Sequence, residues 1–265
     1  MRTALVTGAS SGIGTELARA FARRDHDLIL SARSEERLET LAAELRDAHG
    51  REVTVLPADL AHPNGPAALL ERLRTGGHEV DVLVNNAGVG RHGRFDRIPA
   101  DEDLDQLRLN ALATTTLAKA LLPGMVARGR GGVLNVASTA AFQPGPGMAV
   151  YYASKAYLLH LSEALSEELR GTGVTVTALC PGPTETAFQE RAGMEGARLE
   201  RQRSIHMDAA TAAEAGVRAF QRGQRAYVPG TLNRLGTVIG RLSPHPWTSR
   251  AIAWLHARED ESVRG

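Results

Sequence analysis

Cysteine is nearly absent from this sequence, and features of several other protein classes are missing as well. Cys180 is the only cysteine among 265 residues, which excludes an internal disulfide and favours a reducing compartment. Basic and acidic residues number 31 and 30, so no excess of positive charge is available for a nucleic acid. No apolar run reaches the ~18 residues that a transmembrane helix needs, and no signal-peptide cleavage site follows the apolar N-terminus. We therefore expect a cytoplasmic protein with no transmembrane segment and no nucleic-acid partner.

Linkers, low-complexity stretches and solenoid repeats are also missing, so nothing divides the chain into separate domains. Short β-branched runs alternate with amphipathic stretches such as 37–49, where leucines recur at helical spacing. The expected strands are residues 4–7, 27–31, 53–57, 80–85, 132–136, 174–179 and 226–228. This alternation predicts a single-domain α/β fold of the Rossmann type over residues 1–230. Its core would be a doubly wound, seven-stranded parallel sheet with helices on both faces.

Two segments depart from the alternation of strands and helices. Residues 183–208 are irregular and follow a strand end, where α/β folds place their ligand crevice. We interpret them as a substrate lid, with a plain surface excursion as the equally weighted alternative. Residues 231–265 form a C-terminal helical extension, which we expect to pack on its own domain rather than on another subunit or a membrane surface. Its apolar helical stripe consists of Leu232, Leu235, Val238, Ile239 and Leu242.

Residues 7–14 read Thr-Gly-Ala-Ser-Ser-Gly-Ile-Gly and lie between the first strand and the first helix. The three glycines let the backbone turn tightly and approach a pyrophosphate, and the helix N-terminus offers free N–H groups and its positive dipole end. The context favours a dinucleotide site over a glycine-rich turn without a ligand. The cofactor residues that this loop predicts are Gly8, Ser10, Ser11, Gly12, Ile13 and Gly14.

The end of the second strand bears on the choice of cofactor. An NAD-binding protein typically places a carboxylate there for the ribose hydroxyls, whereas this sequence has Ser31-Ala32-Arg33. A guanidinium binds phosphate in a bidentate manner and keeps its charge, so Arg33 indicates NADP(H), unless it is simply a surface arginine. Glu35 and Glu36 belong to the start of the next helix, and we set them aside as ribose ligands.

Tyr151 and Lys155 stand four residues apart, which places both side chains on one face of a helix. A phenol has an ordinary pKa of about 10, and a nearby ammonium would lower that pKa and make the phenol a useful proton donor and acceptor. Lysine is otherwise scarce, since Lys119 is the only other one. The alternative is that Tyr151 and Lys155 are an ordinary i, i+4 pair on a helix, with no part in proton transfer. Ser138, just after the fifth strand, could hold a substrate oxygen, although a serine there is more often a turn or helix cap.

Taken together, five motifs in this order resemble the short-chain dehydrogenase/reductase family over nearly the whole chain. They are residues 7–14, Asn-Asn-Ala-Gly at 85–88, Ser138, the Tyr151–Lys155 pair, and Pro-Gly-Pro-Thr at 181–184. The more local likeness, at the Ser-Ala-Arg strand end, is to NADP-dependent carbonyl reductases.

The resemblance implies further site residues. Asn110 would join Ser138, Tyr151 and Lys155 as a catalytic tetrad, anchoring a water that links Lys155 to solvent. Tyr151 and Lys155 would also contact the cofactor. The remaining cofactor residues would be Asp59 and Leu60 at the adenine, Asn86, Ala87 and Gly88 at the ribose, and Pro181, Gly182, Thr184 and Thr186 at the nicotinamide and diphosphate.

The family implies a homodimer or homotetramer formed through the helices that carry Asn110 and Tyr151. Many NADP-preferring relatives carry a basic residue in the glycine loop, where this chain has Ser10 and Ser11. NAD(H) therefore stays open as a cofactor beside NADP(H), and no metal site is expected.

We predict an oxidoreductase that moves a hydride between NADP(H) and a carbonyl or secondary alcohol of an apolar small molecule, with Tyr151 as the general acid and base. The pocket walls would come from residues 89–92, 139–144 and the lid, including Phe188. One alternative is a non-catalytic NADP(H)-binding sensor or scaffold. Another is a reductase of 3-oxoacyl thioesters on a carrier protein. The basic patch considered for the latter is Arg91, Arg94, Arg128 and Arg130.

Overall fold

Seven parallel strands form the central sheet of the computed structural model, which describes residues 2–194, 196–198 and 206–257. Along the sheet the strands are ordered β3-β2-β1-β4-β5-β6-β7. Their bounds are β1 Arg2–Thr7, β2 His26–Ser31, β3 Val53–Val55, β4 Val82–Asn85, β5 Gly131–Val136, β6 Val174–Leu179 and β7 Ala226–Tyr227. The predicted sheet is confirmed. β3 is shorter than expected and ends before Pro57, which has no N–H to donate to a strand ladder.

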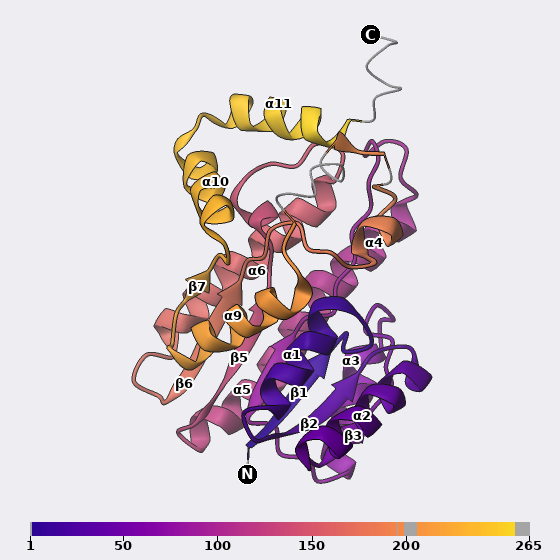
Figure 1. The fold of residues 1–265 in the computed structure, drawn as a ribbon, viewed down its shortest axis with the longest axis vertical. Coiled ribbons are helices and arrows are strands. Elements are labelled where there is room, and N and C mark those ends of the chain that lie inside the picture. The colour runs from indigo at the N-terminus through magenta and orange to yellow at the C-terminus, as the bar shows by residue number, and fades with distance from the viewer. Residues whose placement is uncertain (1, 195, 199–205, 258–265) are drawn as a thin grey trace.

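Helices cover both faces of the sheet (Figure 1). One face carries α1 (Gly12–Ala22), α2 (Glu35–His49) and α9 (Ala209–Gln221), and the other carries α3 (Gly65–Thr75), α5 (Thr114–Ala127) and α6 (Ala149–Glu168). Successive strand residues point to opposite faces, so Ala4 and Val6 of β1 pack in one core and Leu5 in the other. Both faces are buried, which explains why the strands are apolar without interruption.

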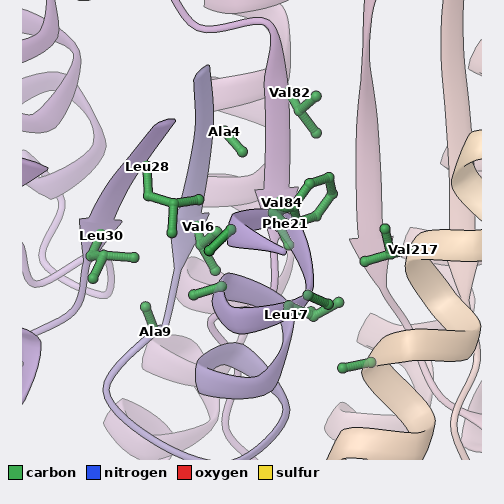
Figure 2. Close-up of a cluster of buried hydrophobic side chains, with 14 of the residues drawn as sticks. Ala4, Val6, Ala9, Leu17, Phe21, Leu28, Leu30, Val82, Val84 and Val217 are labelled. Carbon is green, nitrogen blue, oxygen red and sulfur yellow. The ribbon is translucent and has the colours of Figure 1, made fainter. Parts of the chain in front are cut away.

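The core beside α1 shows how a helix is fixed to the sheet. Leu17 and Phe21 of α1 lie among apolar side chains of β1, β2 and β4, with Val217 of α9 beside them (Figure 2). Phe21 is almost fully buried, which stabilises the fold by about 1.5–3 kcal/mol relative to an exposed ring. This packing sets the position of the N-terminus of α1, and with it the glycine loop.

The order of the strands determines where a ligand can bind. The chain leaves β1 toward β2 on one side, whereas β4 pairs on the other side of β1 and continues to β5. The loops after β1 and β4 therefore diverge and open a crevice at the carboxyl edge of the sheet, as in other doubly wound folds. The loops after β5 and β6 end at the same edge.

Four shorter helical elements complete the described part of the domain. They are α4 (Ala100–Leu107), the π-helical turn η1 (Arg108–Ala113), the 3-10 turn η2 (Thr139–Phe142) and α7 (Phe188–Arg191). α7 falls within the predicted lid, and an isolated bridge between Thr184 and Met207 closes the base of that segment. Residues 195 and 199–205 of the lid lie outside the described residues.

The C-terminal extension forms α10 (Thr231–Leu242) and α11 (His245–His256), at the upper end of Figure 1, beyond the carboxyl edge of the sheet. The expectation that its apolar stripe packs on its own domain is wrong. The stripe points to solvent, and Leu242 is 82% exposed. The polar side of α10 faces the domain instead, because Thr237 is buried and Gly240 lies where a side chain would meet Gln143. Residues 258–265 lie outside the described part.

Within the described ranges, no helix combines the length and the hydropathy that crossing a bilayer requires.

Candidate active site

A cavity of about 710 Å³ opens at the carboxyl edge of the sheet. The predicted site residues from seven separate segments of the chain line it together. They are Gly8, Ser10, Ser11, Gly12, Ile13, Arg33, Asp59, Leu60, Asn86, Ala87, Gly88, Ser138, Tyr151, Lys155, Pro181, Gly182, Thr184 and Thr186. Of the residues predicted for catalysis or cofactor binding, only Gly14 and Asn110 are not among its lining residues. The expected walls 89–92 and 139–144 line the cavity only in part, through Val89, Thr139, Ala140 and Gln143.

The glycine loop has the backbone of a phosphate cradle. Gly8 and Gly12 have φ angles of 65° and 58°, which favour glycine. A Cβ on Gly8 would lie 2.8 Å from the Cα of Ala87, and one on Gly12 would lie 2.9 Å from the Cγ2 of Thr186. Gly14 contributes differently, since its Cβ would lie 2.2 Å from the carbonyl oxygen of Gly8. It lets α1 begin directly against the loop, and the residues present therefore fit a dinucleotide.

Thr7, which sequence reasoning did not single out, connects the glycine loop to the loop after β4. Its hydroxyl accepts hydrogen bonds from the backbone N–H groups of Asn86 and Ala87, both at 3.1 Å, and donates one to the carbonyl of Val84. The amide of Asn86 donates in turn to the carbonyls of Thr7 and Gly8, at 3.0 and 3.1 Å. The two loops that border the crevice are thus hydrogen-bonded to each other before any ligand binds.

Cationic groups gather where β2 ends. Arg33 lines the cavity, and so does Arg37, which the sequence argument did not consider. Neither forms an ion pair among the residues that the structure describes. Glu36, which we set aside as a ribose ligand from its position in the helix, also lines the cavity. Two guanidinium groups against one carboxylate leave this end of the cavity suited to a phosphate.

The π-helical turn η1 aims Asn110 inward. Such bulges interrupt the regular α-helical spacing and are common near functional sites. Asn110 is fully buried; its Oδ1 accepts from the N–H of Val89 at 3.0 Å, and its Nδ2 donates to the Val89 carbonyl at 2.9 Å and to Ser154 Oγ at 3.0 Å. A Cβ on Gly88 would lie 3.2 Å from Lys155 Nζ and 3.3 Å from Asn110 Oδ1. Asn110 therefore lies directly behind the cavity wall, close to Lys155.

Ser138 combines a structural and a site position. It caps the turn η2, where its Oγ accepts from the N–H of Ala140 at 3.1 Å. Its side chain is also hydrogen-bonded to Tyr151, an interaction that acts to lower the pKa of the phenol. The sequence presented a helix cap and a site residue as alternative interpretations of Ser138. In the structure its side chain caps η2 and also interacts with Tyr151.

Tyr151 and Lys155 lie on one face of α6, as predicted, but the pKa of the phenol differs from the expectation. Burial raises the pKa of Tyr151 to about 12, more than the hydrogen bond from Ser138 lowers it. Lys155 Nζ lies 5.7 Å from the centroid of the tyrosine ring and donates to the Val136 carbonyl at 2.8 Å. Burial lowers the pKa of Lys155 to about 8. The expected lowering of the phenol's pKa is thus not found in the ligand-free protein, where loss of solvent raises this pKa.

Several cavity residues carried no recognisable signal in the sequence. Ile252, Leu255 and His256 come from α11, and Met194 and His206 from the lid segment. The sequence showed that the extension is helical and apolar, but not which of its sides faces the domain. Phe188, predicted for the pocket wall, lies with its ring centroid 5.2 Å from that of Tyr151.

Arg191 of α7 was also missed. It lines the cavity, and its Nη2 donates to Ser11 Oγ at 3.2 Å. A guanidinium therefore stands at the glycine loop, although the loop itself contains no basic residue.

The arginines considered as a basic patch do not form one at the pocket. All four pair with acidic neighbours: Arg91 with Glu102, Arg94 with Asp96, and Arg128 and Arg130 with Glu79 and Asp81. Arg128 and Arg130 also lie at the amino end of β4, on the edge of the sheet opposite the cavity. For these two the expectation of a place near the pocket mouth is wrong.

Comparison with known proteins gives a consistent result. A family model described as short chain dehydrogenase matches residues 2–195. The ketoacyl reductase HetN from Nostoc sp. (strain PCC 7120 / SAG 25.82 / UTEX 2576) is 35% identical over 181 residues. This match covers 68% of the chain and 63% of HetN, so it spans just under two thirds of that relative's length.

Two solved structures extend the similarity over most of the chain. A short-chain dehydrogenase from Sphingobium yanoikuyae in complex with NADPH superposes with a TM-score of 0.81 and 38% identity, covering 91% of this chain and 93% of that one. A bulky-bulky ketone specific alcohol dehydrogenase from Comamonas testosteroni has a TM-score of 0.76 and 33% identity, covering 90% and 92%.

Proposed function

The chain belongs to the short-chain dehydrogenase/reductase family, an oxidoreductase family, and from this we propose that it reduces the carbonyl group of an apolar small molecule with NADPH. The observation that carries the proposal is that Ser138, Tyr151 and Lys155 line one cavity together with the residues that suit the cofactor. The phenol of Tyr151 is protonated at neutral pH, and a reduction needs a proton donor for the developing alkoxide. Alcohol oxidation would use the same residues in reverse.

The cofactor residues of this chain suit NADP(H) better than NAD(H). Arg33 and Arg37 would hold the 2′-phosphate, and the N-terminus of α1 with the glycine loop would hold the diphosphate. Arg191, hydrogen-bonded to Ser11, would supply the cation that the loop lacks. The complex of the Sphingobium relative with NADPH agrees with this assignment. When bound, the cofactor supplies the hydride that the carbonyl carbon receives.

The remaining steps belong to side chains of this protein. Ser138 would donate a hydrogen bond to the carbonyl oxygen and polarise the bond. Tyr151 Oη would then give its proton to that oxygen, completing the alcohol. Lys155 would hold the ribose hydroxyls and return a proton to the phenolate, a role its buried position and its pKa of about 8 suit. Asn110 would keep the wall beside Lys155 in place and connect it to solvent through water.

The substrate is proposed to be uncharged and largely apolar. The described part of the cavity near Tyr151 is lined by Met148, Phe188 and Ile252 among others, and a buried charge without a partner would be costly there. The Comamonas relative, named for bulky ketones, supports a ketone as the substrate.

A 3-oxoacyl-thioester reductase is the second candidate, supported by the name of HetN. The ion pairing of Arg91 and Arg94 removes the free positive charge that would have favoured an acidic carrier protein. The sensor alternative is disfavoured by the presence of both Tyr151 and Lys155 in the cavity.

NADPH oxidation, followed by absorbance, tests the proposal across ketones, aldehydes, quinones and 3-oxoacyl thioesters, with NADH in parallel. We expect turnover with apolar ketones that Tyr151→Phe reduces by about 10²–10⁴-fold while NADPH binding stays unchanged. Tyr227→Phe, at a residue of β7 that is not among those lining the cavity, is the matched control. Undiminished turnover in Tyr151→Phe would exclude the proposed acid.

A homo-oligomer is proposed as well. Apolar side chains are exposed on α4, η1 and α6, the helices that the family resemblance assigns to subunit contacts; they are Leu104, Leu107, Leu112 and Tyr157. Light scattering of the wild type and of Leu112→Glu tests this: we expect a dimer or tetramer that the glutamate dissociates, and a monomeric wild type would refute it.

A further inference from the structure

α11 presents one side to the cavity and the other to solvent. Ile252, Leu255 and His256 recur at i, i+3 and i+4, which places them on one helix face, and all three line the cavity. Trp247 and Trp254 of the same helix are 69% and 55% exposed. The helix is therefore oriented with its smaller apolar residues inward, over the pocket that holds Tyr151.

The inward residues belong to a compact apolar cluster that also includes residues next to the proposed acid. Ile252 is buried and packs in one cluster with Met148, Tyr152 and Met194, and Leu255 and Tyr151 lie against that cluster. The wall contributed by α11 is thus continuous with the wall contributed by α6 and by the lid.

The last residue of α11 fixes the helix to the domain through three hydrogen bonds. His256 Nδ1 lies 2.8 Å from the carbonyl oxygen of Pro146, and its Nε2 lies 3.2 Å from Tyr152 Oη. The backbone carbonyl of His256 accepts from His92 Nε2 at 2.9 Å. His256 is 3% exposed. These contacts join α11 to the start of α6 and to the loop after β4.

The chemistry of the three groups determines the direction of each bond. A carbonyl only accepts, so the Nδ1 of His256 carries the hydrogen toward Pro146. Burial lowers the pKa of His256, with His92 lowering it further, while the bond to Pro146 partly offsets this. Burial also raises the pKa of Tyr152. A neutral imidazole with its hydrogen on Nδ1 accepts at Nε2, so Tyr152 donates, and both side chains are satisfied in their uncharged forms.

We propose that α11 is the substrate-selecting wall of this enzyme, and that His256 is the positioning residue that holds it over the pocket. Ile252 and Leu255 contact the apolar substituent of a ketone, so the pocket selects for a bulky, uncharged group on one side of the carbonyl. The inference rests on the proposed ketone reduction and adds the structural element that determines its specificity.

The test compares kcat/KM over a series of aryl or alkyl ketones of increasing size in wild type, Ile252→Ala, Leu255→Ala and the outward-facing control Trp247→Ala. We expect the two inward variants to shift the ratio of large to small ketones by about 10–100-fold, as loss of pocket methylenes does elsewhere, and Trp247→Ala to leave it unchanged. NADPH dissociation constants should be equal in all four. Ile252→Val and Leu255→Val serve if an alanine variant does not fold.

A second comparison addresses His256. Tyr152→Phe removes only the hydroxyl that donates to it, and His256→Phe removes both of its side-chain bonds. We expect KM for the preferred ketone to rise by about 3–10-fold, which corresponds to one lost hydrogen bond of ~1 kcal/mol. The kcat for the smallest ketone and the affinity for NADPH should stay unchanged. A fall in kcat with constant KM would overturn the positioning role.

The two levels of the proposal fail in different ways. If wild type reduces no carbonyl compound with NADPH, the proposed function is wrong, and the inference about α11 falls with it. If wild type is active but Ile252→Ala and Leu255→Ala match Trp247→Ala in size preference, the function stands and the role of α11 is refuted.

Discussion

The side chain of Asn110 hydrogen-bonds both backbone groups of a single residue, accepting from the N–H of Val89 at 3.0 Å and donating to its carbonyl at 2.9 Å. Val89 lies in the loop after β4, and its neighbour Gly88 lies against Lys155. The side-chain amide thus forms the same two hydrogen bonds with Val89 that a residue of a neighbouring strand would form. It holds the loop in place beyond the end of β4. A residue assigned to a water relay through family resemblance therefore also supports the cavity wall.

Two substitutions separate the stability contributed by the Val89 pairing from that contributed by the bond between Asn110 and Ser154. Asn110→Leu keeps the branched shape and the number of heavy atoms of the side chain but leaves the two Val89 groups without partners, so we expect the free energy of unfolding to fall by about 2–3 kcal/mol. Ser154→Ala leaves the Val89 pairing intact and removes the third bond of Asn110 together with the bond that Ser154 Oγ donates to the Tyr151 carbonyl, which should cost about 1–2 kcal/mol. Urea denaturation of the ligand-free proteins measures both. Equal losses in the two variants would show that the Val89 pairing contributes nothing.

Cofactor selection is tested at the end of β2. We expect Arg33→Ala combined with Arg37→Ala to raise KM for NADPH by about 10–100-fold, since each lost guanidinium–phosphate contact is worth ~1.5–3 kcal/mol before compensation by water. KM for NADH should change little, because that cofactor has no 2′-phosphate. Steady-state kinetics with both cofactors in the same preparation provide an internal control. A parallel loss with NADH would mean that these arginines serve folding or the adenine, not the phosphate.

The sheet and the cofactor half of the cavity were predictable from the sequence because both depend on patterns that span only a few residues. Glycines with positive φ, an arginine after a strand and the Tyr151–Lys155 spacing are all set within a few residues, and their meeting at one sheet edge follows from parallel strands. The seven-stranded parallel sheet was confirmed. The site residue roles stay predictions, although the geometry brings nearly all of them to one cavity.

Features that depend on long-range packing were not accessible in this way. The pattern of α10 predicted an inward apolar stripe, whereas Thr237 and Gly240 face the domain, because only a small or polar side fits beside Gln143. The pKa of Tyr151 depends on burial, which spacing alone does not reveal. The position of His256 over the pocket depends on a contact with Tyr152 across 104 residues.

Two glycines in helices provide a matched test of close packing. A Cβ on Gly14 would lie 2.2 Å from the Gly8 carbonyl oxygen, whereas one on Gly236 of α10 would meet nothing within 4 Å. Gly14→Ala should therefore move α1 from the glycine loop, lowering the free energy of unfolding by about 1–3 kcal/mol and weakening NADPH binding. Gly236→Ala should raise it by about 0.5–1 kcal/mol. Thermal unfolding and cofactor titration measure both, and a neutral Gly14→Ala would contradict the close approach.

Lys155 makes a prediction about pH. Its pKa is lowered from 10.5 to about 8 by burial, so below pH 8 the lysine is charged in both the folded and the unfolded chain, and the folded state bears the cost of desolvation. Between pH 8 and 10.5 the unfolded chain binds a proton that the folded chain does not. Stability contributed by this group therefore rises with pH across that window, by roughly 3 kcal/mol in total.

Lys155→Met lacks this titration, so the ligand-free variant should be more stable than wild type at pH 7, and the difference should shrink as the pH rises toward 10. Lys119→Met is the control, because Lys119 is the only other lysine and is exposed to solvent. Its stability should follow that of wild type at every pH. Urea denaturation at half-unit steps from pH 7 to 10 measures the three curves. A constant gap between wild type and Lys155→Met would show that the buried lysine keeps its proton, and that its bond to the Val136 carbonyl compensates for the lost solvent.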